Sequence, residues 1–334
     1  MSHPNVPTIP LRTVRVLVTG AGGPAAVSVL KSLSADPSVR LIAADMDPWA
    51  AGLYLVPPEA RTLIPAGLDP GFADAALARC VAMGVDVLIP TVDAELRPLG
   101  RARADFRRAG IELLLAPDQA LDICLDKLAL AECCAGQVPV PRTERYDQAD
   151  PESWTYPVIV KPRTGSGSRG ISLVESSQAL ARLDASADFL IQEFLPGEEY
   201  SIDVLADAAG HVVASVPRVR ERVDSGVSVA GRTLHDGELE RFGAAVATAT
   251  GLTYIANVQF RRDAAGRPAL LEVNPRVPGT LPLTVASGVD MPRMALDSLR
   301  GRPLPDHAGF RDTAMVRYLQ ECFIELGEVK QVAA

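Results

Sequence analysis

The sequence has little of what usually marks a metal, disulfide or nucleophile site. Its five cysteines form no CxxC pair, and their odd number and spacing fit neither a zinc site nor a disulfide framework. We therefore expect reduced thiols and a cytoplasmic protein. The four histidines have no metal-type spacing and no nucleophile partner. These absences argue against a zinc centre and against catalysis by a Ser-His or Cys-His pair.

Long apolar runs and an excess of positive charge are also absent. No run approaches the roughly 20 apolar residues of a membrane span. Residues 1–12 lack the basic segment and apolar core of a secretory signal, and we interpret them as a poorly ordered tail. The net charge of -8, with acids and bases mixed along the chain, argues against nucleic-acid binding. We expect small-molecule partners, with no nucleic acid and no membrane.

Patterning in the first third predicts a parallel α/β sheet. With 334 residues, 48% of them hydrophobic and 22% charged, the chain is long enough for two or three packed units. Short apolar runs alternate with helical stretches, which indicates a doubly wound sheet. The expected strands cover residues 14–19, 39–45, 61–65, 85–91 and 111–116. This first unit ends near residue 115.

A glycine-rich turn follows the first expected strand. Gly20, Gly22 and Ala25 match the pattern G-x-G-x-x-A, and Asp45 ends the next strand. This arrangement is typical of a dinucleotide site, with phosphate at a helix N-terminus and the acid on a ribose. Pro24 and the double glycine also fit a tight turn that packs a helix or binds part of another substrate. We favour this second interpretation over an NAD site.

The remainder of the chain mixes strands with helices. A helical pattern covers residues 117–135. The segments EYSIDVLAD and HVVASVPRVR predict a hairpin, and a polar loop is expected over 221–236. A helix is expected over 237–250 and another around 288–300, before a strand-like segment, TAMVRYLQE.

Two later apolar runs carry metal-type oxygens on one face. Gln259 lies in the first run, and Glu272 and Asn274 lie two apart in the second, so the last two point the same way in a strand. Counting back from a turn at residues 265–266 places Gln259 opposite Glu272. The same counting places Asn257 opposite Asn274. Carboxylate and amide oxygens on one face suit Mg²⁺ bound with nucleotide phosphates, whereas the alternative is a strand end with polar residues at its mouth.

A phosphate cradle in this chain is not of the Walker A type, because no glycine loop runs into Lys-Ser or Lys-Thr. Lys161 instead closes an apolar strand and precedes the segment RTGSGSRG. Glycines let the backbone approach an anion, and Lys161 supplies a point charge. The glycine-loop residues concerned are Gly165, Ser166, Gly167, Ser168 and Gly170. The alternative is a flexible Gly/Ser hairpin tip.

A third segment, QEFLPGEE at residues 192–199, can offer backbone donors and acceptors to an adenine edge. Glu199 can accept hydrogen bonds from ribose hydroxyls. Taken alone, the segment fits an exposed acidic turn equally well.

The order of these segments resembles that of the ATP-grasp superfamily. The chain is most similar to one synthetase repeat of the carbamoyl phosphate synthetase large subunit, over about residues 14–300. The resemblance is carried by DK at 126–127, VPVP at 138–141, YPVIVKP, NVQF and EVNPR, which follow one another in the expected order.

The resemblance implies an α/β and α+β fold in several parts. A Rossmann-like parallel-sheet domain is expected at 13–115. A two-subdomain ATP-grasp fold follows, with the glycine loop in a central subdomain at 116–190 and the metal site in a C-terminal subdomain at 191–334. The resemblance also argues against an NAD site in the first domain, because that domain is then the unit that precedes an ATP-grasp fold.

The same resemblance implies how a nucleotide is held. Lys127 and Lys161 contact phosphates, and the glycine loop closes over them. Glu193, Phe194 and the backbone of Leu195 hold adenine, and Glu199 holds the ribose. ATP is therefore the expected nucleotide.

The resemblance further implies one or two Mg²⁺ ions, with Mn²⁺ as a substitute, bound by Gln259, Glu272 and Asn274. Glu272 is the expected bridging ligand. Arg276 and Lys161 are the expected catalytic residues, because they stabilise charge on the transferring phosphoryl group. Positioning and charge neutralisation suffice for phosphoryl transfer, so no protein nucleophile is required.

The chain departs from the synthetase pattern in places that concern the substrate. It has the length of a single repeat and no glutaminase-like domain. Its loop reads GSGSRG instead of a run of glycines, and the sequence diverges after EVNPR, at VPGTLPL. These departures favour a different substrate over a lost ATP site.

An arginine-rich stretch is the candidate for substrate recognition. Arg218 and Arg220 alternate, so they share a face if the strand continues, and arginine pairs bidentately with carboxylates. We expect these residues, with Arg276, to hold a carboxylate substrate. The alternative is an exposed basic strand edge that discourages edge pairing.

The sequence therefore predicts an ATP-dependent carboxylate–amine ligase of the amino-acid type. In such a reaction ATP phosphorylates the carboxylate, and the amine then displaces phosphate to form an amide. Two alternatives remain at this point: phosphorylation of bicarbonate or carbamate, and a non-catalytic nucleotide-binding module. A homodimer is compatible with the resemblance.

Overall fold

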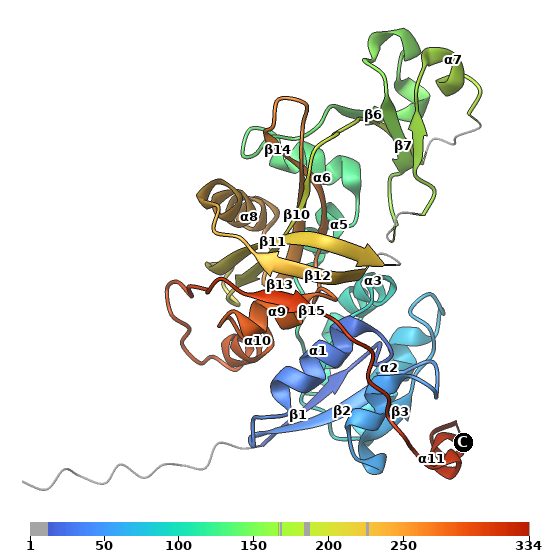
Figure 1. Cartoon of the computed structure of the whole chain (residues 1–334). Coiled ribbons are helices and arrows are strands. Elements are labelled where there is room, and N and C mark those ends of the chain that lie inside the picture. Colours follow the sequence, from blue (N-terminus) through green and yellow to red (C-terminus); the bar gives the residue numbers. More distant parts are fainter. Residues whose placement is uncertain (1–12, 166, 168, 184–187, 225–226, 334) are drawn as a thin grey trace, which may run out of the picture.

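The computed structural model describes residues 13–333 except 166, 168, 184–187 and 225–226, so the tail expected at residues 1–12 lies outside the described part. Within that part the strands form one parallel sheet followed along the chain by two antiparallel sheets (Figure 1). The expected combination of α/β and α+β structure is confirmed. The domain boundaries at residues 115 and 190 stay predictions.

The first sheet is parallel and has the order β3-β2-β1-β4-β5. Its strands are β1 (Val14–Val18), β2 (Val39–Asp45), β3 (Arg61–Leu63), β4 (Val87–Ile89) and β5 (Glu112–Leu113). Helices α1 (Pro24–Leu33), α2 (Phe72–Ala82), α3 (Asp93–Arg101) and α4 (Arg103–Arg108), with 3-10 turns at Ala51–Leu55 and Pro58–Ala60, connect them. The central strands are apolar because both of their faces are covered, as is usual for parallel sheets.

The second sheet is antiparallel, with the order β14-β13-β10-β11-β12-β15. Its strands are β10 (Glu199–Ala206), β11 (Val212–Asp224), β12 (Val227–Thr233), β13 (Tyr254–Arg262), β14 (Pro268–Asn274) and β15 (Ala314–Val316). Helices α5 (Asp118–Cys124), α6 (Lys127–Cys134), α8 (Gly237–Thr250), α9 (Leu281–Ala286) and α10 (Met291–Leu299) accompany it. Helix α8 packs on β10 and β11, while α9 and α10 contact α1 of the first sheet, so one apolar core joins the two sheets.

The third sheet is smaller and has the order β6-β9-β7-β8. Its strands are β6 (Thr143–Arg145), β7 (Val158–Pro162), β8 (Ser172–Val174) and β9 (Phe189–Glu193), accompanied by α7 (Ser177–Leu180) and 3-10 turns at Tyr146–Gln148 and Pro151–Ser153. It has a separate apolar cluster around Trp154, Val160 and Ile191. In Figure 1 this sheet stands apart from the rest of the molecule, at the top right.

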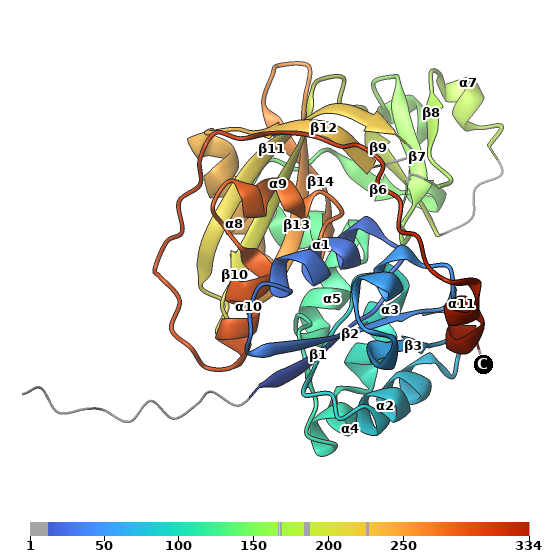
Figure 2. The same cartoon turned by 60° about the horizontal axis from the view of Figure 1, so that its bottom comes forward.

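The end of the chain links the second sheet back to the first. After α10 it adds β15 to the edge of β12 and then runs to α11 (Leu326–Ala333), which lies against β3 (Figure 2). There Val329 is buried, and Arg61 Nη1 lies 2.6 Å from Glu328 Oε2. We call residues 301–333 the terminal segment.

Three sequence expectations need correction. The helix expected over 117–135 is divided into α5 and α6, because the Asp126 side chain caps a new helix by accepting from the N–H groups of Leu128 and Ala129. The polar loop expected over 221–236 contains the end of β11 and all of β12, which pair with each other despite their polar composition. The helix expected at 288–300 is preceded by a further short helix, α9.

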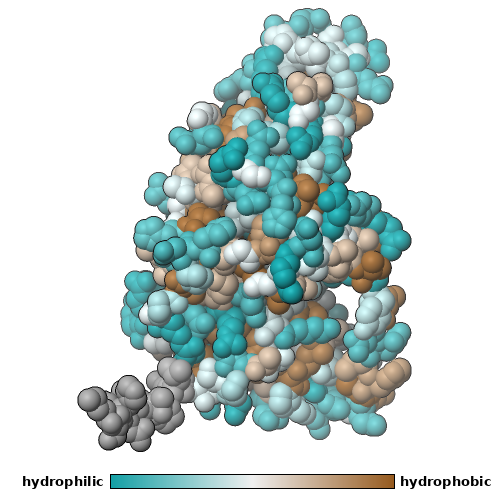
Figure 3. All heavy atoms as spheres, turned by 60° about the vertical axis from the view of Figure 1, so that its left-hand side comes forward, coloured by the Kyte–Doolittle hydropathy of each residue, from teal (hydrophilic) through white to brown (hydrophobic). Residues whose placement is uncertain are grey.

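The surface gives no sign of a membrane-spanning helix: none of the helices in the described part is long and apolar enough to cross a bilayer. The face in Figure 3 is mostly hydrophilic, with apolar residues in small groups. Large apolar side chains that are exposed include Tyr318, Leu319 and Phe323 of the terminal segment.

Candidate active site

A cavity of about 970 Å³ lies where the three sheets meet. The loops after β1 to β4 form one wall, at the carboxyl edge of the first sheet, where ligands usually bind in open α/β sheets. The hairpin of β13 and β14 forms a second wall. The third sheet supplies a third, through Ile159, Lys161, Gly167, Ile171 and Gln192.

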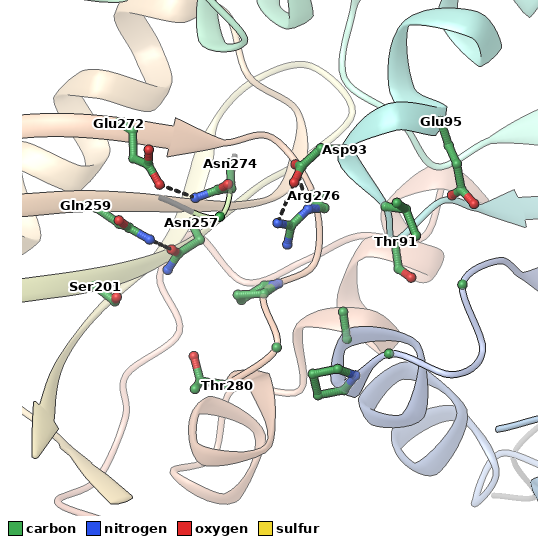
Figure 4. A pocket seen from close by; sticks show the side chains of 18 of the residues that line it. Thr91, Asp93, Glu95, Ser201, Asn257, Gln259, Glu272, Asn274, Arg276 and Thr280 are labelled. Carbon is green, nitrogen blue, oxygen red and sulfur yellow. Dashed lines mark hydrogen bonds and ion pairs between the residues drawn. The ribbon is translucent and has the colours of Figure 1, made fainter. Parts of the chain in front are cut away.

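The hairpin has the pairing that the sequence predicted. Gln259 lies opposite Glu272, and Asn257 lies opposite Asn274. The loop spans residues 263–267 and is longer than the two-residue turn assumed in the counting. A bulge shifts the register by one residue, since Phe260 pairs with Leu270 whereas Gln259 pairs with Glu272. This shift restores the predicted pairing. All four polar side chains line the cavity (Figure 4).

Hydrogen bonds within the hairpin turn the amide nitrogens of two of these residues toward their neighbours. Gln259 Nε2 donates to Asn257 Oδ1 at 3.3 Å, and Asn274 Nδ2 donates to Glu272 Oε1 at 3.4 Å. The amide oxygens of Gln259 and Asn274 are therefore left for another partner. A carboxylate and two amide oxygens on one cavity wall form a donor set that fits Mg²⁺.

Two lysines line the cavity beside this face. Lys161 is buried in β7, and its Nζ donates to Gln192 Oε1 at 2.8 Å. Burial, and secondarily the charge of Lys127, lower the pKa of Lys161 to about 8. Lys127 begins α6 and donates from Nζ to Gly165 O at 2.7 Å, and burial lowers its pKa as well. Among the described residues, no carboxylate is bonded to either amine, so these two partly desolvated cations are suited to phosphate groups.

The glycine loop lies at the mouth of the cavity. Gly165, Gly167 and Gly170 have φ values of 113°, 72° and 72°, a region that glycine adopts at little cost. Gly167 lines the cavity, whereas Ser166 and Ser168 lie outside the described residues. The loop begins beside Arg163, whose Nε donates to Asp126 Oδ2 at 2.7 Å.

The segment expected to hold adenine and ribose follows Gln192. Glu199 lines the cavity, and Arg220 Nη1 donates to its Oε1 at 2.5 Å. Leu195 is buried, Phe194 lies 6.0 Å from the Arg261 guanidinium, and Glu193 accepts a hydrogen bond from the backbone of Arg142. The side chains of residues 193–195 do not line the described cavity, so their contact with adenine stays a prediction.

Comparison with known proteins gives a family match for the second part of the chain. The family described as "ATP-grasp in the biosynthetic pathway with Ter operon" matches residues 185–322, which contain the metal-type hairpin.

Over this part of its length the chain matches an ATP-grasp domain. Its sequence is 31% identical over 230 residues to the carbamoyl phosphate synthase large chain of Thermomicrobium roseum, a match that covers 62% of this chain and 21% of that protein. It is 26% identical over 187 residues to the D-alanine--D-alanine ligase of a Synechococcus species, covering 49% of this chain and 58% of that ligase. The first curated relatives are thus much longer, since the chain spans only about a fifth of their length.

The fold comparison agrees. The biotin carboxylase domain of Hydrogenobacter thermophilus 2-oxoglutarate carboxylase, a dimer in complex with MgADP, ADP and bicarbonate, superimposes with a TM-score of 0.72. The sequences are 17% identical, and the match covers 87% of this chain and 70% of that domain. At this identity the likeness concerns the fold alone, and it confirms the expected ATP-grasp architecture.

The three arginines predicted to hold a substrate lie in different surroundings. Arg218 is 1% exposed and forms a bidentate pair with Asp203, with distances of 2.9 and 2.5 Å, so it is not part of the cavity lining. Arg220 and Arg276 do line the cavity. Arg276 pairs bidentately with Asp93 of α3, at 2.7 and 2.8 Å (Figure 4). The structure thus separates Arg218 from the other two.

Residues of the first sheet complete the cavity wall, and the sequence reasoning missed several of them. Thr91, Asp93 and Glu95 follow β4 and line the cavity. Glu95 is 4% exposed, Thr19 Oγ1 donates to its Oε2 at 2.5 Å, and burial raises its pKa to about 7. Polar residues directly after a parallel strand were the available signal, since such residues gather at the carboxyl edge of the sheet.

The glycine turn after β1 also belongs to this wall. Gly20 has a φ of 64° and lies so close to Val92 that a Cβ atom would come within 2.5 Å of Val92 Cγ2. Asp45 Oδ2 accepts from the N–H of Gly22 at 2.7 Å. The acid therefore binds the turn itself, and both face the same cavity as the ATP-grasp residues.

Proposed function

We propose that this protein is an ATP-dependent ligase that joins a carboxylate to an amine and releases ADP and phosphate. The observation that carries the proposal is the meeting of two complementary groups in one cavity. Lys127 and Lys161 offer positive charge to phosphates, and Gln259, Glu272 and Asn274 offer oxygens to a divalent cation. The names of the relatives support it, since they include a carbamoyl phosphate synthase and a D-alanine--D-alanine ligase.

The nucleotide phosphates would lie between the lysines and the hairpin. Glu199 lines the same cavity and is the candidate for the ribose. Gln259, Glu272 and Asn274 would hold Mg²⁺, or Mn²⁺ as a substitute. When bound, such an ion neutralises charge on the phosphates and fixes their geometry.

The proposed reaction needs no protein nucleophile. A carboxylate oxygen attacks the terminal phosphorus of ATP, and the bond to ADP breaks to give an acyl phosphate. The amine nitrogen then attacks the acyl carbon, phosphate leaves with the bonding electrons, and the amine loses a proton. Lys161 and Arg276 lower the barrier of the first step by stabilising negative charge on the transferring group.

Arg276 can act on a substrate without losing its partner. Its bonds to described residues, two to Asp93 and one to Val277 O, use three of its N–H groups, and a guanidinium carries five in total. The donors that are left can bind an anionic substrate group. Arg220 is the second candidate for the carboxylate, because it reaches the cavity beside Glu199.

The two substrates would enter at the end of the cavity next to the first sheet. Pro278, Gly279 and Thr280, which follow Arg276, line that end together with the first-sheet wall. Lysine and arginine are missing from the lining residues that the first sheet contributes, whereas Asp45 and Asp47 are among them. This charge pattern suits a cationic amine better than a second carboxylate.

Phosphorylation of bicarbonate is the second candidate function. It is favoured by the relatedness to carbamoyl phosphate synthase and by a structural neighbour whose complex contains bicarbonate. It differs from ligation in its requirements, because ATP turnover would depend on bicarbonate alone.

An ADP-release screen distinguishes these functions. The full chain is incubated with ATP, Mg²⁺ and amino acids, singly and in pairs, with and without bicarbonate. ADP release is measured, and the masses of the products are determined by mass spectrometry. We expect at least one pair to turn over faster than either compound alone and to give a product with the mass of the pair minus water. Turnover with bicarbonate and no amine would favour the second candidate, and nucleotide binding without turnover on any substrate would overturn both.

A further inference from the structure

A buried polar network lies beside the oxygen-bearing face of the hairpin, on the neighbouring strands β10 and β11. At its centre is Asp203 of β10, which is fully buried. Its Oδ2 accepts from Arg218 Nε at 2.9 Å and Thr284 Oγ1 at 2.5 Å, and its Oδ1 accepts from Arg218 Nη2 at 2.5 Å and Asn257 Nδ2 at 2.8 Å. Each carboxylate oxygen thus has two donors, so the group is held in a fixed orientation.

The network reaches the cavity through a chain of amides. Asn257 Nδ2 donates its hydrogen bond to Asp203, so the amide oxygen of Asn257 is the end that faces Gln259. Gln259 Nε2 donates to that oxygen, which leaves Gln259 Oε1 as the end turned toward the cavity (Figure 4). An amide has a donor at one end and an acceptor at the other, and only the acceptor can bind a cation.

We propose that Asp203 and Arg218 are positioning residues for the cation site, acting through Asn257 on the amide of Gln259. This proposal rests on the proposed function and names how one of its metal ligands is oriented. Without the neighbouring Asp203 carboxylate, the Asn257 amide is no longer held with its oxygen toward Gln259. Gln259 is then free to turn its nitrogen toward the cation. Arg218, expected from the sequence to bind the substrate, has a different task here: it compensates the charge of Asp203.

A buried ion pair is by itself weak evidence of a stabilising role. Taking two charges out of water costs on the order of several kcal/mol. Apolar residues of similar volume often stabilise a protein as well as a buried ion pair does, or better. A purely structural link between β10, β11 and α9 is nevertheless the competing explanation. The two explanations differ in one respect: a structural link affects every ligand of the cavity, whereas the orientation of an amide matters only for Gln259.

The experiment uses this difference in a double-mutant cycle on the full chain. Binding of Mn²⁺ in the presence of ADP is measured by electron paramagnetic resonance of the free ion, which requires no catalysis. We expect Asn257→Ala to weaken Mn²⁺ binding about tenfold, the lower end of what loss of a residue behind a metal ligand costs. In a Gln259→Glu background the same substitution should cost less than about twofold, because a carboxylate presents oxygen in either orientation.

Removal of the pair tests the deeper part of the network. Asp203→Leu combined with Arg218→Met removes both charges together and leaves no unpaired ion behind. We expect weaker Mn²⁺ binding, again about tenfold, with unchanged affinity for ADP without metal. If this variant does not fold, the cycle on Asn257 still decides.

The outcomes separate this inference from the proposed function. Glu272→Gln must weaken Mn²⁺ binding, since it alters a ligand itself; if it does not, the metal site and the proposed function fail together. If Glu272→Gln weakens binding but Asn257→Ala does not, only the positioning role is overturned. An equal loss for Asn257→Ala with Gln259 and with Glu at that position also overturns it, because the effect is then structural.

Discussion

Burial shifts the pKa values of two ionisable side chains in the cavity wall in opposite directions. Lys161 and Glu95 are both almost fully buried, and for both, desolvation disfavours the charged form. The pKa of the lysine is therefore lowered, and that of the acid is raised. In the described part of the chain neither residue has an ion-pair partner, so both should titrate within the pH range where the protein can be studied.

Lys161 should make nucleotide binding depend on pH. With a pKa of about 8 in the free protein, its charge is complete at pH 7 and is lost above pH 8. We expect ADP affinity to fall by up to about tenfold per pH unit between pH 8 and 9.5, because phosphates bind the charged form. Calorimetric titration at several pH values measures this.

The matched variants for this prediction are Lys161→Met and Lys31→Met. Lys161→Met should bind ADP about 10- to 100-fold more weakly at pH 7 and lose the fall above pH 8, since a hydrogen bond to a charged group contributes about 1.5–3 kcal/mol. Lys31 is exposed on α1, so its replacement should leave both properties unchanged. A fall that persists in Lys161→Met would assign the titration to another group.

Glu95 should make the free energy of unfolding depend on pH, with a stabilising contribution that is present at low pH and lost as the pH rises. Its pKa is raised from 4.5 to about 7, so the folded state binds a proton more readily than the unfolded state. The associated stability is complete below pH 4.5 and is lost as pH rises through about 7. We expect Glu95→Gln to exceed the wild type at pH 8 by up to about 3 kcal/mol in free energy of unfolding, and to match it near pH 5.

Urea unfolding at the two pH values checks the prediction for Glu95. Asp122→Asn is the control, because Asp122 is exposed on α5 and its ion pair with Arg97, at 3.3 Å, is largely in solvent. The same gain in both variants at pH 8 would contradict a specific role of burial at Glu95.

At the scale of single elements, helix α8 illustrates how local signals and packing combine. Asp236 caps it by accepting from the N–H groups of Glu238 and Leu239, and Gly251 ends it with a φ of 70°. These signals let the sequence predict its bounds, 237–250, without error. What they do not reveal is Gly243, where the helix lies against β10 and β11.

Gly243 should be essential for the packing of α8. A Cβ at this position would come within 2.6 Å of Ser215 Oγ and 2.7 Å of Ile202 Cγ2, both of which lie in the sheet core. Alanine favours a helix by about 1 kcal/mol over glycine, but overpacking costs about 1–3 kcal/mol. We expect Gly243→Ala to destabilise the protein in thermal unfolding.

Gly237→Ala is the control on the same helix, since the nearest atom to its added Cβ is a flexible arginine end at 3.5 Å. It should be neutral or slightly stabilising. A stabilising Gly243→Ala would mean that α8 can shift away from the sheet.

The elements that the sequence mispredicted share a cause. The segment that forms β12 reads VSVAGRT, and its polar and glycine residues suggest a loop until β11 and β15 pair with it on both sides. The break between α5 and α6 depends on one aspartate used as a cap in the middle of a helical pattern. In both cases a tertiary or capping contact outweighs the periodicity of the segment.

At the scale of the whole molecule, two further connections tie the first sheet to the second, beyond the apolar core that α1 shares with α9 and α10. One is the terminal segment, which ends in α11 on β3. The other is the ion pair of Asp93 with Arg276, which crosses the cavity and is partly buried on both sides, with 21% and 19% of the side chains exposed. The second connection lies within the proposed active site, so the first sheet should influence the reaction directly.

Asp93→Asn tests this influence. The amide can accept only one of the two bonds from Arg276 and carries no charge, so the guanidinium loses its fixed position. In the ADP-release assay with an active substrate pair, we expect kcat to fall about tenfold with a smaller change in the KM for ATP.

Asp122→Asn again serves as the control, because it alters an exposed ion pair to the same helix, α3, through Arg97. Equal kinetics of Asp93→Asn and the wild type would show that Arg276 needs no anchor in the first sheet. A change in KM alone would assign Asp93 to binding and not to the chemical step.

The sequence by itself determined the strand-helix alternation of the first sheet and the oxygen-bearing face of the hairpin. It also determined Lys161 with its glycine loop. These features depend on periods of two or 3.6 residues and on neighbours close in the chain, which can be counted. The tertiary structure alone decided that Arg218 is buried on Asp203 while Arg220 and Arg276 reach the cavity. It also brought Asp93 and Glu95 to the same cavity, because contacts between residues far apart in the chain depend on how the sheets pack, which no local pattern records.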